Sequence, residues 1–174
     1  MQKNILITGC SSGLGLALSN YYLIKGYKVY GISRNKPDIS DINFIHKSFD
    51  LSNISQIKTQ LSSFIEDIKE IDTIFLNAGM LGKIKLLNDF SIDELNEVYS
   101  LNVYANKEIL DILMNIKVKD IIVISSGASK NGYKGWGAYS LSKASVNMLV
   151  NLYSNEMMNT KIIALAPGVV KTPM

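Results

Sequence analysis

Tyr139 and Lys143 have the residue types and the spacing that proton transfer to a carbonyl group requires. They lie four positions apart in a segment of helical periodicity, so both side chains project from one face of a helix. A nearby ammonium group favours the phenolate and lowers the pKa of a tyrosine. Ser126 ends an apolar run and could donate a hydrogen bond to the same carbonyl oxygen. Taken alone, this spacing also describes an exposed helix pair, so its meaning depends on the rest of the chain.

A glycine-rich turn near the N-terminus could hold a phosphate. An apolar run that ends at Ile7 leads into this turn, and a helical segment follows directly. Glycines let the backbone approach a ligand closely, and the start of a helix offers unpaired N–H groups at the positive end of its dipole. The pattern predicts a dinucleotide-binding turn between a strand and a helix. The residues expected to contact the dinucleotide here are Gly9, Ser11, Ser12, Gly13, Leu14 and Gly15.

Short apolar runs alternate with segments of helical period along the whole chain. Each run is continuously apolar, as parallel strands covered on both faces usually are. The alternation predicts an α/β fold, a doubly wound parallel sheet with helices on both faces, in a single domain over residues 1–174. The predicted strands are Ile5–Ile7, Val29–Ile32, Ile74–Leu76, Ile121–Ile124 and Ile162–Leu165, with a weaker one at Asn43–Phe49. The predicted helices are Leu14–Tyr21, Ile54–Ile68, Ser91–Ile116 and Ala138–Met158.

Two of these helices depart from a single continuous apolar stripe. Ser91 and Glu94 form a capping box at the start of the third helix, and Asn102 interrupts its apolar face. A buried amide needs partners, so Asn102 predicts either a hydrogen bond or a bend in the helix. The last helix has two apolar stripes, and the second of them suggests a subunit partner. We therefore expect a homodimer or homotetramer through the helices around 91–116 and 138–158.

Ligands of doubly wound folds bind beyond the carboxyl ends of the strands, so the residues that follow each apolar run are candidates for binding. Any one polar or glycine-bearing turn is routine, but their occurrence after every predicted strand favours a ligand groove. After the glycine turn, these segments are Ser33-Arg34, Asp50-Leu51, Asn77-Ala78-Gly79, Ser125-Ser126 and Pro167-Gly168-Val169-Val170-Lys171-Thr172.

The motifs occur in an order that resembles the short-chain dehydrogenase/reductase family, in its short single-domain branch. Thr8–Gly15 is similar to that branch's Thr-Gly-x-x-x-Gly-x-Gly, and Tyr139 with Lys143 to its Tyr-x-x-x-Lys. The other matching positions are Asn77-Ala78-Gly79, Asn102, Ser126 and the segment from Pro167 to Thr172. The resemblance spans nearly the whole chain.

The resemblance implies an oxidoreductase that transfers a hydride between a nicotinamide cofactor and a carbonyl or alcohol substrate. It makes Tyr139 the general acid/base and Ser126 the group that orients the substrate carbonyl. Lys143 would bind the nicotinamide ribose and depress the tyrosine pKa, and Asn102 would position a water in a proton relay. The further cofactor contacts that it implies are Asp50 at the adenine, Val170 and Thr172 at the nicotinamide end, and Leu51, Asn77, Ala78, Gly79, Pro167 and Gly168.

Arg34 decides the expected choice of cofactor. An acidic residue at the end of the second strand would bind the ribose 2′-hydroxyl and repel a 2′-phosphate. This chain has an arginine there, which can pair with a phosphate through two N–H groups. We therefore expect NADP(H) to be preferred over NAD(H). The alternative is that Arg34 stacks on the adenine or faces solvent.

The chain stops shortly after the Pro-Gly segment, at Met174. The resemblance implies a further strand and a loop-and-helix lid over the substrate, and both are missing from this sequence. The alternatives are a trimmed chain or a protein that lacks a lid, and in the second case a non-catalytic dinucleotide-binding module or sensor becomes possible. The remaining candidates for the substrate pocket suggest a partly apolar substrate. They are Met80, Leu81, Tyr133, Trp136 and Val169.

Composition excludes several other functions. Hydrophobic residues make up 47% and charged residues 19% of the 174, the formal charge is +3, and no basic block suggests nucleic acid. The longest apolar runs fall short of a membrane span, and the single cysteine permits no intrachain disulfide, so we expect a cytoplasmic protein. No cluster has the spacing of metal ligands. Gly9–Gly13 also fits the nucleophile turn of α/β-hydrolases, but the only histidine, His46, lies in an expected strand.

Overall fold

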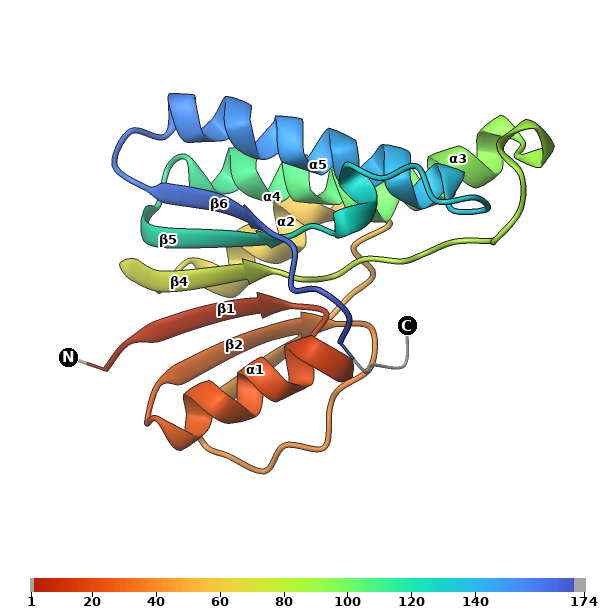
Figure 1. Cartoon of the computed structure of the whole chain (residues 1–174). Helices are drawn as coiled ribbons and strands as arrows, with labels where there is room; N and C mark the ends of the chain where they lie inside the picture. Colours follow the sequence, from red (N-terminus) through yellow and green to blue (C-terminus); the bar gives the residue numbers. More distant parts are fainter. Residues whose placement is uncertain (1, 171–174) are drawn as a thin grey trace.

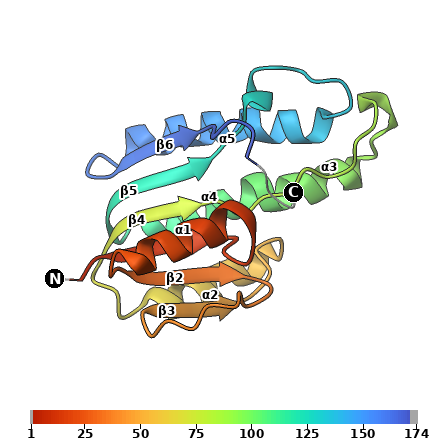
Figure 2. The ribbon, with the colours of Figure 1, turned by 60° about the horizontal axis from the view of Figure 1, so that its bottom comes forward.

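Six parallel strands form one sheet in the order β3-β2-β1-β4-β5-β6. A computed structural model describes residues 2–170 of the chain. The strands span Asn4–Thr8 (β1), Lys28–Ser33 (β2), Phe44–Ser48 (β3), Glu70–Leu76 (β4), Lys117–Ile124 (β5) and Lys161–Leu165 (β6). All of the predicted strands are therefore confirmed, including the weaker one that becomes β3. The order reverses direction between β1 and β4, and Figure 2 shows the strands fanning from β3 to β6.

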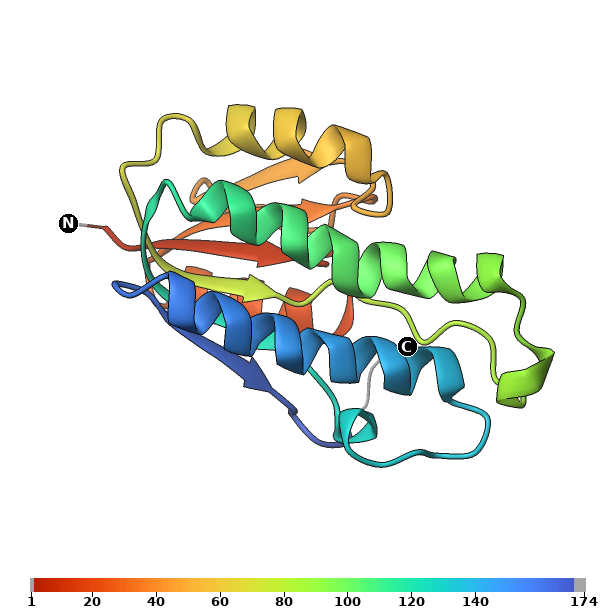
Figure 3. The same ribbon diagram turned by 90° about the horizontal axis from the view of Figure 1, so that it is seen from above.

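Helices cover both faces of the sheet. One face carries α1 (Gly13–Ile24), and the other carries α2 (Ile54–Ile65), α4 (Ala105–Leu113) and α5 (Gly137–Glu156), which run side by side in Figure 3. α3 (Ile92–Tyr99) extends beyond the carboxyl ends of the strands (Figure 1). The doubly wound parallel sheet is thus confirmed. No helix within residues 2–170 is long and apolar enough to cross a bilayer.

The continuous apolar runs become strands because each is buried from two sides. Ile5, Leu6 and Ile7 are each at most 1% exposed, with Leu6 in the larger core and Ile5 and Ile7 in the smaller one. The larger core lies beneath α2, α4 and α5, and the smaller one beneath α1. Burial of this kind stabilises a fold by about 25 cal/mol per Å² of apolar surface.

The predicted helix from Ser91 to Ile116 is divided by a π-helical turn. The turn covers Ser100–Tyr104 and separates α3 from α4. The capping box at its start is confirmed, because Ser91 and Glu94 each bond the other's backbone N–H. Asn102 lies inside the π-helical turn and is fully buried. The sequence left a hydrogen bond and a bend as alternatives, and the structure has a hydrogen-bonded amide within a locally widened helix.

The two apolar stripes of α5 have different environments. Val146, Val150, Tyr153 and Met157 are buried in the larger core, as a stripe that packs on the sheet should be. The other stripe is open to solvent in the single chain. Its members Leu141, Met148 and Leu152 are 44%, 59% and 52% exposed.

Candidate active site

The glycine turn between β1 and α1 requires its glycines for two different reasons. Gly9 and Gly13 have positive φ values of 69° and 52°, which side chains with a Cβ rarely adopt. At Gly15 the constraint is space, since a Cβ there would lie 2.2 Å from the carbonyl oxygen of Gly9. The Gly9 N–H also bonds the carbonyl of Ile32 at 2.7 Å, which ties the turn to the end of β2.

The start of α1 fits a phosphate group. Ser12 is the N-cap residue, yet its side chain makes no capping hydrogen bond, and the first turn of α1 contains no acidic residue. The N–H groups of this turn are therefore not capped by a side chain, and they stand at the positive end of the helix dipole. Such a terminus suits the pyrophosphate of a dinucleotide. The described residues thus fit the cofactor that the sequence implies.

Asn77 joins the glycine turn to the end of β4. Its side-chain N–H groups bond the carbonyls of Thr8 and Gly9 at 3.1 and 3.2 Å. In return, the hydroxyl oxygen of Thr8 accepts the backbone N–H groups of Asn77 and Ala78 at 2.9 and 3.1 Å. Sequence reasoning missed the role of Thr8, although a threonine that ends a buried strand is itself a signal for such a bond. These contacts hold two neighbouring strand ends in register at the groove.

Gly79 lies where the backbone passes between two functional side chains. A Cβ at this position would be 3.2 Å from Oδ1 of Asn102 and 3.5 Å from Nζ of Lys143. The side-chain amide of Asn102 bonds both the N–H and the carbonyl of Met80, and it also donates to the hydroxyl of Ser142 at 2.9 Å. Both amide hydrogens of Asn102 are therefore used within the protein.

Lys143 and Tyr139 are brought together on α5, as their spacing predicts. Nζ of Lys143 lies 5.6 Å from the centroid of the Tyr139 ring and donates to the carbonyl of Ile124 at 2.7 Å. The two side chains are 4% and 8% exposed. Burial lowers the pKa of Lys143 to about 8, because an ammonium loses hydration there.

The pKa of Tyr139 differs from the expectation. The sequence predicts that the ammonium lowers it, whereas burial of the phenol raises it and only a hydrogen bond with the Ser126 side chain lowers it. Desolvation of the phenol therefore outweighs the hydrogen bond with Ser126. The oxygen of Ser126 also accepts the N–H of Ala128 at 3.1 Å, which fixes the serine at the start of a short turn after β5. Ser126 and Tyr139 thus belong to one cluster.

The remaining predicted cofactor contacts occupy different environments. Arg34 is exposed at the end of β2. Asp50 is also exposed, and hydrogen bonds from Ser52 lower the pKa of its carboxyl group, with a smaller effect from Arg34. The side chain of Leu51 packs in the larger core, so only its backbone is left to face a ligand. Pro167, Gly168 and Val170 follow β6 and are exposed, and Thr172 lies outside the described residues.

Two loops meet beside the catalytic candidates. Lys85 forms a short parallel bridge with Trp136, and its N–H bonds the carbonyl of Gly135 at 3.1 Å. The ring of Trp136 stands edge-on to Tyr139 with centroids 5.9 Å apart, and it also stands edge-on to Tyr133 with centroids 5.6 Å apart. Three aromatic rings therefore lie in contact beside the catalytic candidates.

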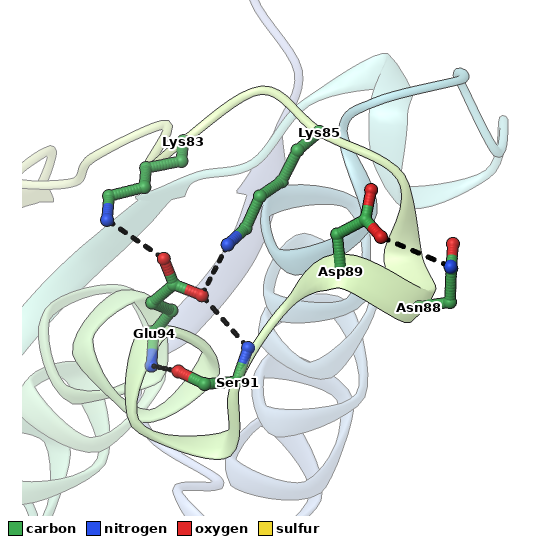
Figure 4. Close-up of polar contacts among 6 residues, drawn as sticks. All are labelled: Lys83, Lys85, Asn88, Asp89, Ser91 and Glu94. Atoms are coloured by element: carbon green, nitrogen blue, oxygen red, sulfur yellow. Dashed lines mark hydrogen bonds and ion pairs between the residues drawn. The ribbon is translucent and has the colours of Figure 1, made fainter.

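An ionic cluster anchors the first of these loops to α3. The carboxylate of Glu94 pairs with Lys83 at 2.9 Å and with Lys85 at 2.6 Å, and it also caps the N–H of Ser91 (Figure 4). These bonds hold the pKa of Glu94 well below its ordinary value. The sequence predicted the capping box but not the two lysines, because they come from a loop whose path is set by tertiary contacts.

A parallel sheet of this order, with a glycine turn and a Ser–Tyr–Lys cluster at its carboxyl edge, defines a dinucleotide-binding oxidoreductase. The sequence model of the short chain dehydrogenase family matches residues 3–174, so the chain belongs to the short-chain dehydrogenase/reductase family. It is an NAD(P)-dependent enzyme of that family.

Relatives of known sequence and structure agree with this assignment. Benzil reductase ((S)-benzoin forming) of Bacillus subtilis is 37% identical over 183 residues, which cover 97% of this chain and 75% of the relative. NADPH-dependent pterin aldehyde reductase of Arabidopsis thaliana is 26% identical, with 99% of this chain and 76% of the relative covered. A short chain dehydrogenase family protein of Francisella tularensis has a solved structure with a TM-score of 0.90 at 26% identity, covering 99% of this chain and 72% of that one.

Proposed function

We propose that this protein reduces an apolar carbonyl compound with NADPH and uses Tyr139 as the general acid. The observation that carries the proposal is the cluster of Ser126, Tyr139 and Lys143 beside a glycine turn that suits a pyrophosphate. When bound, the nicotinamide supplies the hydride. Tyr139 donates its hydroxyl proton to the carbonyl oxygen, and Ser126 donates a hydrogen bond to the same oxygen.

Lys143 supports this chemistry in two ways. One of its three N–H donors is used by the carbonyl of Ile124, and the others are available for the nicotinamide ribose. Its positive charge favours the phenolate that Tyr139 becomes after it has given up a proton. The family resemblance implies that Asn102 positions a water in a proton relay with Lys143. The side-chain amide of Asn102 itself is hydrogen-bonded to Met80 and Ser142.

Arg34 supports a preference for NADP(H). It is exposed at the end of β2, where a guanidinium can pair with a 2′-phosphate through two parallel hydrogen bonds. The Arabidopsis relative is named for NADPH dependence, which agrees with this assignment. The substrate class follows from the aromatic rings of Tyr133 and Trp136 beside Tyr139, and from a relative that acts on benzil. We assign an aryl ketone or diketone to this surface.

The exposed stripe of α5 supports a homodimer or homotetramer. Met148 and Leu152 are more than half exposed, and such a contiguous apolar strip on a helix is usually covered by another surface. Replacing both residues by lysine is expected to convert the oligomer to a monomer in light scattering. We assign the protein to the cytoplasm, because its one cysteine is buried and forms no disulfide within the chain.

The direct test is turnover of NADPH with benzil by the purified protein. Tyr139→Phe is expected to lower kcat by about 100-fold or more, since general acid catalysis contributes about 10²–10⁴. NADPH binding measured by calorimetry should stay within about twofold, because the phenyl ring preserves the packing. The control is Tyr104→Phe, which removes a hydroxyl from an exposed tyrosine away from the cluster. Binding of NADPH without turnover over a panel of carbonyl compounds would instead favour a non-catalytic module.

A further inference from the structure

Three side chains from three separate segments form a hydrogen-bonded chain beside the glycine turn. Sγ of Cys10 lies 3.2 Å from Oγ of Ser33, and the same oxygen lies 2.9 Å from Nε2 of His46. Cys10 belongs to the glycine turn, Ser33 ends β2, and His46 lies within β3. Cys10 and Ser33 are 0% and 7% exposed, and His46 is half-buried. This series of hydrogen bonds therefore connects the glycine turn to β3, the outer strand of the sheet.

The direction of these bonds follows from the number of hydrogens. The hydroxyl of Ser33 donates its one hydrogen to the carbonyl of Asn35 at 2.8 Å. Its oxygen is then the acceptor for the other two neighbours, so Cys10 donates its S–H and His46 donates Nε2–H. This fixes the tautomer of a neutral His46. Burial and the charge of Lys36 lower the pKa of this imidazole, so the neutral ring prevails at neutral pH.

The carbonyl groups of Arg34 and Asn35 each accept a hydrogen bond from a serine hydroxyl, one at the end of β2 and one at the end of β3. Ser33 holds the carbonyl of Asn35, and Ser48 donates to the carbonyl of Arg34 at 2.5 Å. β3 is registered with β2 so that Ser48 lies opposite Ser33 and His46 opposite Gly31. Gly31 has to be small, because a Cβ there would lie 2.7 Å from Sγ of Cys10. The backbone carbonyl of Arg34 is thus hydrogen-bonded while its side chain remains exposed.

We propose that His46 is a positioning residue for cofactor selection: through Ser33 it holds the Arg34–Asn35 turn so that the guanidinium meets the 2′-phosphate. This inference rests on the proposed preference for NADP(H). A β3 residue that only stabilised the fold would affect every nucleotide equally, whereas a residue that positions Arg34 affects only nucleotides with a 2′-phosphate. The comparison of two ligands separates these roles.

The experiment is calorimetric binding of 2′,5′-ADP and of 5′-AMP, which share the adenosine and differ by the 2′-phosphate. His46→Ala should weaken binding of 2′,5′-ADP by about fivefold to tenfold, as expected for one lost hydrogen bond, and change that of 5′-AMP by less than about twofold. His46→Gln should restore most of the difference, since its amide retains an N–H donor. The control is Ile45→Ala, which removes packing from β3 without touching Ser33.

Ser48→Ala provides a second variant that does not depend on the folding of the histidine variants. It removes an exposed hydroxyl that donates a hydrogen bond to the carbonyl of Arg34. Like His46→Ala, it should weaken binding of 2′,5′-ADP more than binding of 5′-AMP. If the wild-type protein binds both nucleotides equally, the NADP(H) preference itself is wrong. If it discriminates, and His46→Ala and Ser48→Ala discriminate as well as it does, the positioning role is overturned. Equal losses in His46→Ala and His46→Gln would overturn the role of the N–H donor.

Discussion

The side-chain amide of Asn102 pairs with both backbone polar groups of Met80, accepting its N–H at 2.8 Å and donating to its carbonyl at 2.9 Å. The same amide donates to Ser142, which lies between Tyr139 and Lys143 on α5. One residue of the π-helical turn therefore joins the segment after β4 to the helix that carries the catalytic candidates. The contact lies beside Gly79, where an added Cβ would be 3.2 Å from Oδ1 of Asn102 and 3.5 Å from Nζ of Lys143.

Asn102→Ala is expected to be strongly destabilising. It leaves the N–H and carbonyl of Met80 without their partner in a partly buried place, and an unsatisfied buried group costs about 1–3 kcal/mol. We expect the free energy of unfolding in urea to fall by about 2–4 kcal/mol, together with a loss of turnover. Asn151→Ala, which truncates an exposed asparagine of α5, is the control and should change stability by less than about 0.5 kcal/mol. A loss below about 1 kcal/mol for Asn102→Ala would contradict the role of this amide.

Lys143 should make stability depend on pH in the alkaline range. Its pKa is about 8 in the folded state and 10.5 in the absence of burial, so between these values the unfolded chain binds the extra proton. Stability therefore rises with pH there, by up to about 1.4 kcal/mol per unit. The unfolding free energy of the wild type minus that of Lys143→Met should rise from pH 8 to pH 10.5 and stay constant below pH 8. A difference that is flat across this window would show that the ammonium is not desolvated.

Arg34→Glu should reverse the choice of cofactor. A carboxylate at the end of β2 repels a 2′-phosphate and can bind a ribose 2′-hydroxyl. We expect the ratio of kcat/KM for NADPH to that for NADH to fall by about tenfold or more, equivalent to about 1.4 kcal/mol. Lys25→Glu, at the far end of α1, makes the same change in net charge away from the groove and should leave the ratio unchanged. Retention of the NADPH preference in Arg34→Glu would refute the assignment.

Glu94→Gln should remove the ionic part of the cluster in Figure 4 and keep the capping box, because glutamine can still accept the N–H of Ser91. The pKa of Glu94 is depressed in the folded state, so the stabilisation is present above its ordinary value of 4.5 and is lost as the pH falls below it. The melting temperature of the wild type should therefore exceed that of Glu94→Gln at pH 7, and the difference should shrink toward pH 3.

The matched control for this cluster is Glu97→Gln. Glu97 is exposed on the same helix and raises the pKa of Lys83 only through its charge, without a hydrogen bond to it. Glu97→Gln should lower the melting temperature at pH 7 by much less than Glu94→Gln does. If the melting temperatures of the wild type and Glu94→Gln differ by the same amount at pH 7 and pH 3, the ion pairs do not stabilise the loop.

The sequence by itself determined the strands, the glycine turn and the helix cap, because short stretches of residues specify each of them. Short continuous apolar runs favour strands that are covered on two faces, and positions 9 and 13 need glycine for a turn with positive φ. The Tyr139–Lys143 spacing places two side chains on one helix face whatever the surroundings. The capping box of Ser91 and Glu94 is likewise complete within four residues.

Tertiary structure alone decided the environment of those residues. The direction of the Tyr139 pKa depends on burial by distant segments, and it therefore came out opposite to the expectation from the neighbouring ammonium. The partners of Asn102, and the chain from Cys10 through Ser33 to His46, join residues that are far apart in sequence. Desolvation and hydrogen bonding act over a few ångströms of space, and only the folded backbone determines which groups lie within that range.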